Sequence, residues 1–165
     1  MPTASHLKVA DEMWIAAALL QQERGIDGDF TPVEIARRAE DEGLSQDHRP
    51  GVLLHAQYHA VATRPPNPGR YCMLTETTRG RRRLFRPGDP CDPKRAGAKT
   101  YPDPLELPER YRPLVEWYVH QYVPQGVRKE KHPMDQLREW AGRVRPFRAI
   151  NADDYIRELR SGWDA

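Results

Sequence analysis

The sequence has few features of secreted, membrane-spanning or disulfide-stabilised proteins. Its only two cysteines, Cys72 and Cys91, are too few for a disulfide framework, so we expect both thiols to be reduced. The longest apolar run, 13–20, is much shorter than a membrane span requires. The first residues lack the basic region and apolar stretch of a signal peptide. We therefore expect a cytoplasmic protein with no membrane partner.

Catalytic motifs are missing as well. The 165 residues contain no glycine-rich phosphate loop, no HExxH and no GxSxG. Asp153 and Asp154 are better explained as helix-capping residues than as a metal pair, because adjacent helical side chains diverge by about 100°. We predict a binding protein with no catalytic residue and no cofactor. A nuclease is the weaker alternative.

The charged residues are strongly segregated along the chain. Residues 1–47 carry four basic and ten acidic side chains, whereas 48–90 carry eight arginines and two carboxylates. The last fifteen residues are acidic again. A basic block between acidic segments is typical of a local phosphate-binding surface. The 38% apolar content and 16 prolines predict a globular part and a second part that is extended or depends on a partner.

Three helices are predicted in the N-terminal part, and the second has the clearest signals. Thr31 is its N-cap, Pro32 occupies the first helical position and Glu34 completes a capping box. Phe30 and Ile35 are placed to form a hydrophobic staple. The spacing of apolar residues predicts the first helix over 9–24 and the third over 50–62. In the third helix, Leu54, Tyr58 and Val61 are expected on one face, and His55, His59 and Val52 on the other.

A β-hairpin is expected next, with strands over 71–75 and 82–86 and Gly80 in the turn. Three helices followed by a hairpin are the elements of a winged helix-turn-helix. The predicted fold class is mainly α with a small β-hairpin, completed by a helical, partly extended C-terminal region. We predict a winged-helix-like DNA-binding domain over 1–90, a proline-rich linker over 91–108, a connecting or dimerisation helix over 109–124 and an extended partner-binding tail over 125–165.

Arginines are concentrated at the turn and on the return strand of this hairpin. Guanidinium groups bind phosphates and can enter a minor groove, although a solvated charged turn would also protect an edge strand. Strand alternation places Arg82 opposite its two arginine neighbours, and Leu84 inward. The predicted DNA-binding residues are Arg49, His55, His59, Arg79, Arg81, Arg82 and Arg83. A zinc site made by His55, His59, Cys72 and Cys91 is a minor alternative, since no CxxC motif is present.

Two C-terminal segments carry apolar side chains that need a partner surface. A stripe in the fourth predicted helix must pack on the N-terminal domain, on a second copy or on another protein; it consists of Tyr111, Leu114, Val115, Tyr118 and Tyr122. The last fifteen residues predict a short helix that Asn151 caps, with Ile156, Leu159 and Trp163 on one face. A terminal helix this short requires a groove, either on a partner or on its own domain.

The terminal segment NADDYIRELRSGWDA resembles the toxin-binding tail of VapB-type antitoxins. The resemblance implies the antitoxin of a type II toxin–antitoxin system, which represses its own promoter and neutralises a PIN-domain ribonuclease. Arg160, or next Arg157, would reach the acidic active site of the toxin. The predicted toxin-binding residues are Trp140, Phe147, Tyr155, Ile156, Arg157, Leu159, Arg160 and Trp163.

The expected partners are operator DNA and the toxin, in a homodimer or a hetero-oligomer. Two other functions fit the same pattern. One is a stand-alone winged-helix transcriptional regulator whose C-terminal helices dimerise. The other is an adaptor whose N-terminal domain contacts protein and not DNA.

Overall fold

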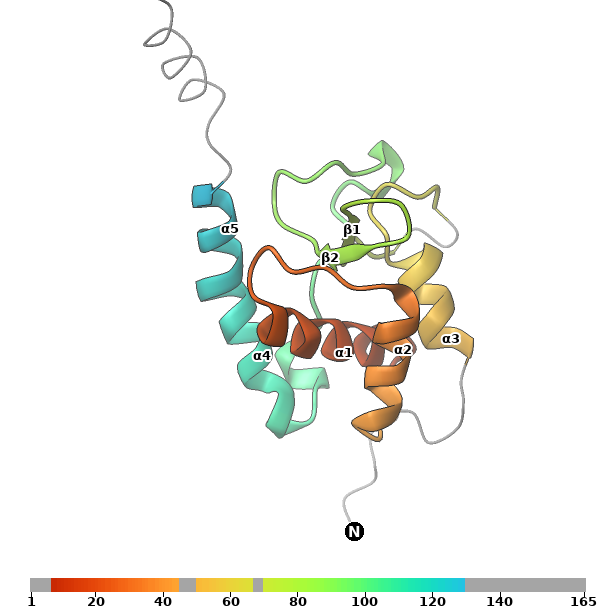
Figure 1. Cartoon of the computed structure of the whole chain (residues 1–165), viewed down its shortest axis with the longest axis vertical. Coiled ribbons are helices and arrows are strands. Elements are labelled where there is room, and N and C mark those ends of the chain that lie inside the picture. The colour runs from red at the N-terminus through yellow and green to blue at the C-terminus, as the bar shows by residue number, and fades with distance from the viewer. Residues whose placement is uncertain (1–6, 45–49, 67–69, 130–165) are drawn as a thin grey trace, which may run out of the picture. The chain divides into compact units, whose positions relative to one another are not determined.

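The computed structural model describes residues 7–44, 50–66 and 70–129 (Figure 1). The chain divides into two compact units, 1–129 and 130–165. We call the described part of the first unit the head. The head is mostly helical and contains one two-stranded antiparallel sheet, as the sequence predicts. None of the helices within the described ranges is long and apolar enough to cross a membrane.

Helix α1, Val9–Arg24, is the centre of the head, and its bounds are those that the apolar spacing predicts. Eleven of its 16 residues are buried. It contacts α2, α3, β2 and α4, so neighbours enclose it on several sides (Figure 1). Its alanines Ala16, Ala17 and Ala18 are fully buried. Because alanine adds little volume, these positions let the surrounding elements approach the α1 backbone closely.

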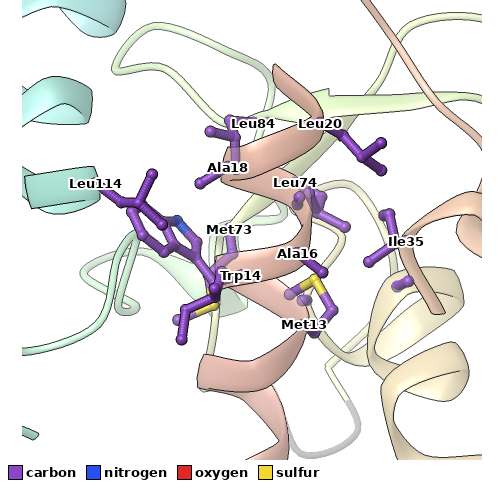
Figure 2. Close-up of a cluster of buried hydrophobic side chains, with 14 of the residues drawn as sticks. Met13, Trp14, Ala16, Ala18, Leu20, Ile35, Met73, Leu74, Leu84 and Leu114 are labelled. Atoms are coloured by element: carbon purple, nitrogen blue, oxygen red, sulfur yellow. The ribbon is translucent and has the colours of Figure 1, made fainter. Parts of the chain in front are cut away.

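Helix α2, Pro32–Asp41, begins with the predicted capping box. The Thr31 hydroxyl accepts a hydrogen bond from the Glu34 amide, and the Glu34 carboxylate accepts one from the Thr31 amide. Phe30 and Ile35, the predicted staple, are both fully buried. Ile35 and the α1 side chain Leu20 belong to the same apolar core, which Figure 2 shows around α1. The local signals at this helix therefore agree with its tertiary packing.

The third helix is shorter than predicted. Helix α3, Pro50–Leu54, continues into a π-helical turn, His55–His59, and the chain leaves helical structure before residue 62. Its start approaches α1 closely, since a Cβ atom added at Gly51 would lie 3.0 Å from Val9 Cγ1. The buried side chains of this segment are small or β-branched, namely Val52, Ala56 and Ala60.

The hairpin consists of β1, Leu74–Glu76, and β2, Arg82–Leu84, both shorter than predicted. Leu74 pairs with Leu84, and both are buried. Gly80 lies in the turn with φ 80°, a conformation that glycine adopts without steric cost. Phe30 extends the sheet on the other side of β2: its amide donates to the Arg82 carbonyl and its carbonyl accepts from the Arg82 amide, each at 2.8 Å.

The segment 91–108, predicted to be a linker, is instead folded onto the head. It contains two 3-10 helices, Pro93–Arg95 and Pro104–Glu106, and their N-caps are Asp92 and Asp103. Arg95 and Leu107 are buried, with 1% and 3% exposed surface. Prolines at first helical positions and aspartate caps give this proline-rich stretch a fixed conformation, which composition alone does not distinguish from a linker.

The fourth predicted helix also belongs to the head. A 3-10 turn, Glu109–Tyr111, leads into α4, Arg112–Trp117, then into a π-helical turn, Tyr118–Tyr122, and α5, Val123–Lys129. Trp14 of α1 packs edge-on against Tyr118 at 5.7 Å between ring centroids and lies beside Leu114 (Figure 2). All five residues of the predicted stripe are buried within the head. The expected boundary between a DNA-binding domain ending at residue 90 and a separate helix over 109–124 is therefore wrong.

Candidate functional site

The outer face of the third helix carries two large apolar side chains that are exposed to solvent. Leu54 is 44% exposed and Tyr58 is 51% exposed. Val61, which the sequence places on the same face, lies beyond the end of the helix and is buried. The buried side of this helix carries the smaller residues Val52 and Ala56, and its start lies close to Val9 of α1.

A hollow of about 390 Å³ opens beside this face. The Arg64 guanidinium lies 5.8 Å from the centre of the Tyr58 ring, within the range of a cation–π contact. Arg64 also forms an ion pair with Glu76 at 3.7 Å, but its Nε atom has no hydrogen-bond partner among the described residues. The lining residues are Leu54, Tyr58, His59, Arg64 and Pro65. An aromatic ring, an apolar side chain and a cation thus share one concave surface.

The two histidines predicted to read DNA are half-buried and pack on each other. Their ring centres are 5.1 Å apart, and the His55 ring is 6.1 Å from that of Tyr71. His55 Nδ1 lies 2.8 Å from the Gly51 carbonyl oxygen. Burial lowers the pKa of His55 more than its hydrogen bond with Gly51 raises it, so this side chain is neutral at pH 7. His55 is therefore poorly placed to contact a phosphate, whereas His59 reaches the hollow.

The predicted arginine cluster of the hairpin is largely neutralised by carboxylates of the head. Arg81 pairs with Asp29 at 2.6 Å, and Arg83 pairs with Asp89 at 2.6 Å. The Arg82 side chain is buried and pairs with Glu76 at 3.1 Å. The alternation predicted from the sequence is confirmed, because Arg82 and Leu84 are buried while their neighbours are more exposed. Arg81, Arg82 and Arg83, which the sequence predicts to bind DNA, thus each have a carboxylate partner within the head, and their contact with DNA stays a prediction.

Arg79 differs from the other hairpin arginines. It lies in the turn, its side chain is exposed, and no ion pair joins it to another described residue. Of the predicted DNA-binding arginines, Arg49 lies outside the described residues. Arg79 is thus the hairpin side chain best placed to contact a phosphate.

Arg95 supports the hollow from behind, and no feature of the sequence indicates this role. Its guanidinium donates to the carbonyl oxygens of Arg64 at 2.9 Å, His59 at 2.8 Å and Tyr71 at 2.6 Å. It also lies 3.1 Å from the Pro65 carbonyl oxygen. Three of these carbonyls belong to residues that line the hollow. Arg95 therefore fixes the backbone that shapes the candidate surface.

Two predicted sites remain, the alternative zinc site and the toxin-binding tail. Among the described residues, which include the four residues of the zinc alternative, no group of three or more His, Cys, Asp or Glu side chains is arranged to hold a metal ion. The predicted toxin-binding residues, from Trp140 to Trp163, lie outside the described residues. They stay predictions from the sequence.

Comparisons of the chain with protein-family models, with curated proteins and with solved structures found no match.

Proposed function

We propose that the protein binds double-stranded DNA through its head, in the manner of a winged helix. The order of elements supports this: α1, an extended residue at Phe30, α2, the third helix and the hairpin follow one another as they do in that fold. The pairing of Phe30 with Arg82 carries the proposal. This isolated bridge joins the chain before α2 to β2, so that the hairpin is attached directly to the helical part of the head.

In this proposal the outer face of the third helix enters the major groove. Helix-turn-helix proteins read bases with the exposed side chains of this helix. Leu54 and Tyr58 offer apolar surface for thymine methyl groups, and Arg64 offers donors for phosphate or guanine. Arg79 at the hairpin turn binds the backbone beside it. The other hairpin arginines hold the wing together through their ion pairs.

The test is a titration of fluorescent duplex DNA from the region upstream of the protein's own coding sequence, followed by anisotropy. Tyr58→Ala and Arg79→Ala should each weaken binding, and Arg79→Ala should also reduce the salt dependence by about one counterion. Arg110→Ala is the matched control, because Arg110 is exposed but lies outside the proposed face, over the Tyr111 ring. Equal affinity of all three variants and the unaltered chain would refute this mode of binding and favour the adaptor.

We propose in addition that the tail neutralises a PIN-domain ribonuclease, which makes the protein an antitoxin. The proposal is supported by the resemblance of NADDYIRELRSGWDA to VapB-type tails and by the division of the chain after residue 129. The head buries its own fourth helix, so that helix does not offer the apolar stripe for dimerisation that a stand-alone regulator would use. Operator binding and toxin binding would then use different parts of the chain.

This second part is tested by co-purification from native cells with the full chain and with a chain that ends at Asn151. The expected result is recovery of a small PIN-domain ribonuclease by the full chain alone, with its RNA cleavage suppressed. Arg160→Ala should restore cleavage, while Arg143→Ala, outside the terminal segment, should not. If truncation abolishes only self-association of the chain, the antitoxin proposal fails and the stand-alone regulator takes its place.

A further inference from the structure

The two cysteines, which lie in separate elements of the sequence, meet in the head. Their Sγ atoms are 2.8 Å apart. Cys72 is buried, and Cys91 is half-buried and therefore partly open to solvent. Both pack in a small apolar cluster with Ala62, Phe85 and Ala98. To form a disulfide bond of about 2.05 Å, the two sulfur atoms would have to approach each other by less than about 1 Å.

The backbone holds both cysteines in this arrangement. The Cys72 amide donates to the Lys99 carbonyl, and the Asp92 amide, next to Cys91, donates to the Ala62 carbonyl, each at 2.9 Å. These two bonds fasten both ends of the segment 91–99 to the chain around the third helix and β1. The thiols are therefore held close together by the fold, and ring closure needs no large rearrangement.

We propose that Cys72 and Cys91 are a site of reversible oxidation, at which a hydroperoxide converts the two thiols into an intramolecular disulfide. The Cys91 sulfur attacks the peroxide O–O bond, which gives a sulfenic acid at Cys91 and releases an alcohol, or water from hydrogen peroxide. The Cys72 sulfur then attacks the Cys91 sulfur. The S–S bond forms, the S–O bond breaks, and the thiol proton of Cys72 leaves with the hydroxyl group as water.

The surroundings of the two thiols fix the order of these steps. Cys72 is buried, and burial, together with its hydrogen bond with Cys91, raises the pKa of its thiol to about 12. This thiol is protonated before Cys91 is oxidised and is hidden from a dissolved oxidant; it loses its proton only as it attacks the adjoining sulfenic acid, whose hydroxyl group takes the proton. Cys91 is the sulfur that solvent reaches, so oxidation starts there and Cys72 resolves the sulfenic acid.

The disulfide would clamp the segment that carries Arg95 to the head. Arg95 bonds the carbonyls behind the hollow, and the Cys72 Sγ atom itself lies 3.7 Å from the Arg95 carbonyl oxygen. A covalent link would tie Cys91, at the start of the segment 91–99, to Cys72, whose amide already bonds the Lys99 carbonyl at the end of that segment. Oxidation is expected to reduce opening of the segment 91–99 and to raise the unfolding temperature, because a cross-link constrains the unfolded chain.

The experiment treats the reduced full chain with hydrogen peroxide, counts free thiols by alkylation and mass spectrometry, and repeats the count after dithiothreitol. The unaltered chain should lose both thiols together, as a monomer, and recover both on reduction. Hydrogen exchange should slow at the amides of Cys72 and Asp92 in the oxidised chain. Two thiols that remain alkylatable, or a disulfide that forms only between chains, would overturn the proposal, as would unchanged exchange at both amides.

Two variants separate the roles of the sulfur atoms. Cys72→Ser should leave a sulfenic acid at Cys91 that dimedone traps, whereas Cys91→Ser should leave Cys72 unoxidised. Cys72→Ala replaces the first variant if the buried serine prevents folding. Trapping of a sulfenic acid at Cys72 in the Cys91→Ser chain, at the rate seen for Cys91, would refute the assigned order. None of these results depends on whether the head binds DNA.

Discussion

The hairpin and the segment that follows it hold their arginine side chains with different partners. Arg81, Arg82 and Arg83 each pair with a carboxylate, and the Arg81 side chain is still 39% exposed. Arg95 is 1% exposed, and it is bonded to backbone carbonyls with no ion pair among the described residues. The difference shows that the arginines of these two regions are not interchangeable units of surface charge: these four are parts of the fold.

The largest effect is expected for Arg95→Ala. The substitution removes one side chain and leaves several buried carbonyls without a donor, at a cost on the order of 3–5 kcal/mol in the free energy of unfolding. Arg95→Lys should recover little of this, because one ammonium group cannot reach carbonyls that the planar guanidinium contacts from several sides. Equilibrium unfolding in urea measures the free energy of unfolding of both variants. A loss below about 1 kcal/mol would mean that the carbonyls find water, and that Arg95 is not the support we describe.

A smaller but still clear loss is expected for Asp89→Ala. The Asp89 carboxylate accepts hydrogen bonds from Arg83 at 2.6 and 2.7 Å, from the Thr75 hydroxyl at 2.8 Å and from the Arg86 amide at 2.7 Å. Its removal leaves a guanidinium that is only 13% exposed without its carboxylate, which should cost about 2–3 kcal/mol. Glu109→Ala is a suitable control, because Glu109 is exposed and no ion pair of the described residues involves it. Equal urea midpoints for the two variants would contradict this account.

The same carboxylate makes stability depend on pH. Burial raises the pKa of Asp89, but the hydrogen bonds from Arg83 and the Arg86 amide lower it more, so the folded pKa lies below the unfolded value of about 3.9. The contribution of Asp89 is therefore complete above the unfolded pKa and is lost as the pH falls through the folded pKa. Urea midpoints between pH 6 and pH 3 should fall less steeply for Asp89→Ala than for the unaltered chain. Parallel curves would show that Asp89 does not titrate with folding.

The sequence predicts best where neighbouring residues decide the structure. The bounds of α1, the capping box at Thr31 and the buried stripe of the fourth helix follow from local spacing and local hydrogen bonds, and all three are confirmed. The exposure of Leu54 and Tyr58 does not follow from local spacing, because the side of the third helix that is buried is set by its packing against α1 and α2. The prediction of a linker over 91–108 is wrong because the fold of this segment depends on carbonyls that Arg95 reaches across the head.

The candidate surface shows the same limit. Arginine positions and net charge are visible in the sequence, but Asp29, the partner of Arg81, lies in the acidic block that charge counting separates from the hairpin. The exposure of Tyr58 and the support from Arg95 have no local signal at all. Contacts between residues that are distant in the chain decide which side chains remain exposed, and neither spacing nor composition reveals those contacts.

The smallest effects on stability are expected for Arg81 and Arg79 at the hairpin turn. Arg81 has a carboxylate partner, whereas no ion pair joins Arg79 to another described residue. Arg81→Ala removes an ion pair between partly exposed groups, which should cost at most about 1 kcal/mol of unfolding free energy and less in high salt. Arg79→Ala removes no ion pair of the described residues, so stability should change by no more than about 0.5 kcal/mol. Thermal unfolding at low and high ionic strength distinguishes them. A salt-sensitive loss for Arg79→Ala would mean that Arg79 also belongs to the fold, and a drop in DNA affinity could then no longer be assigned to a missing phosphate contact.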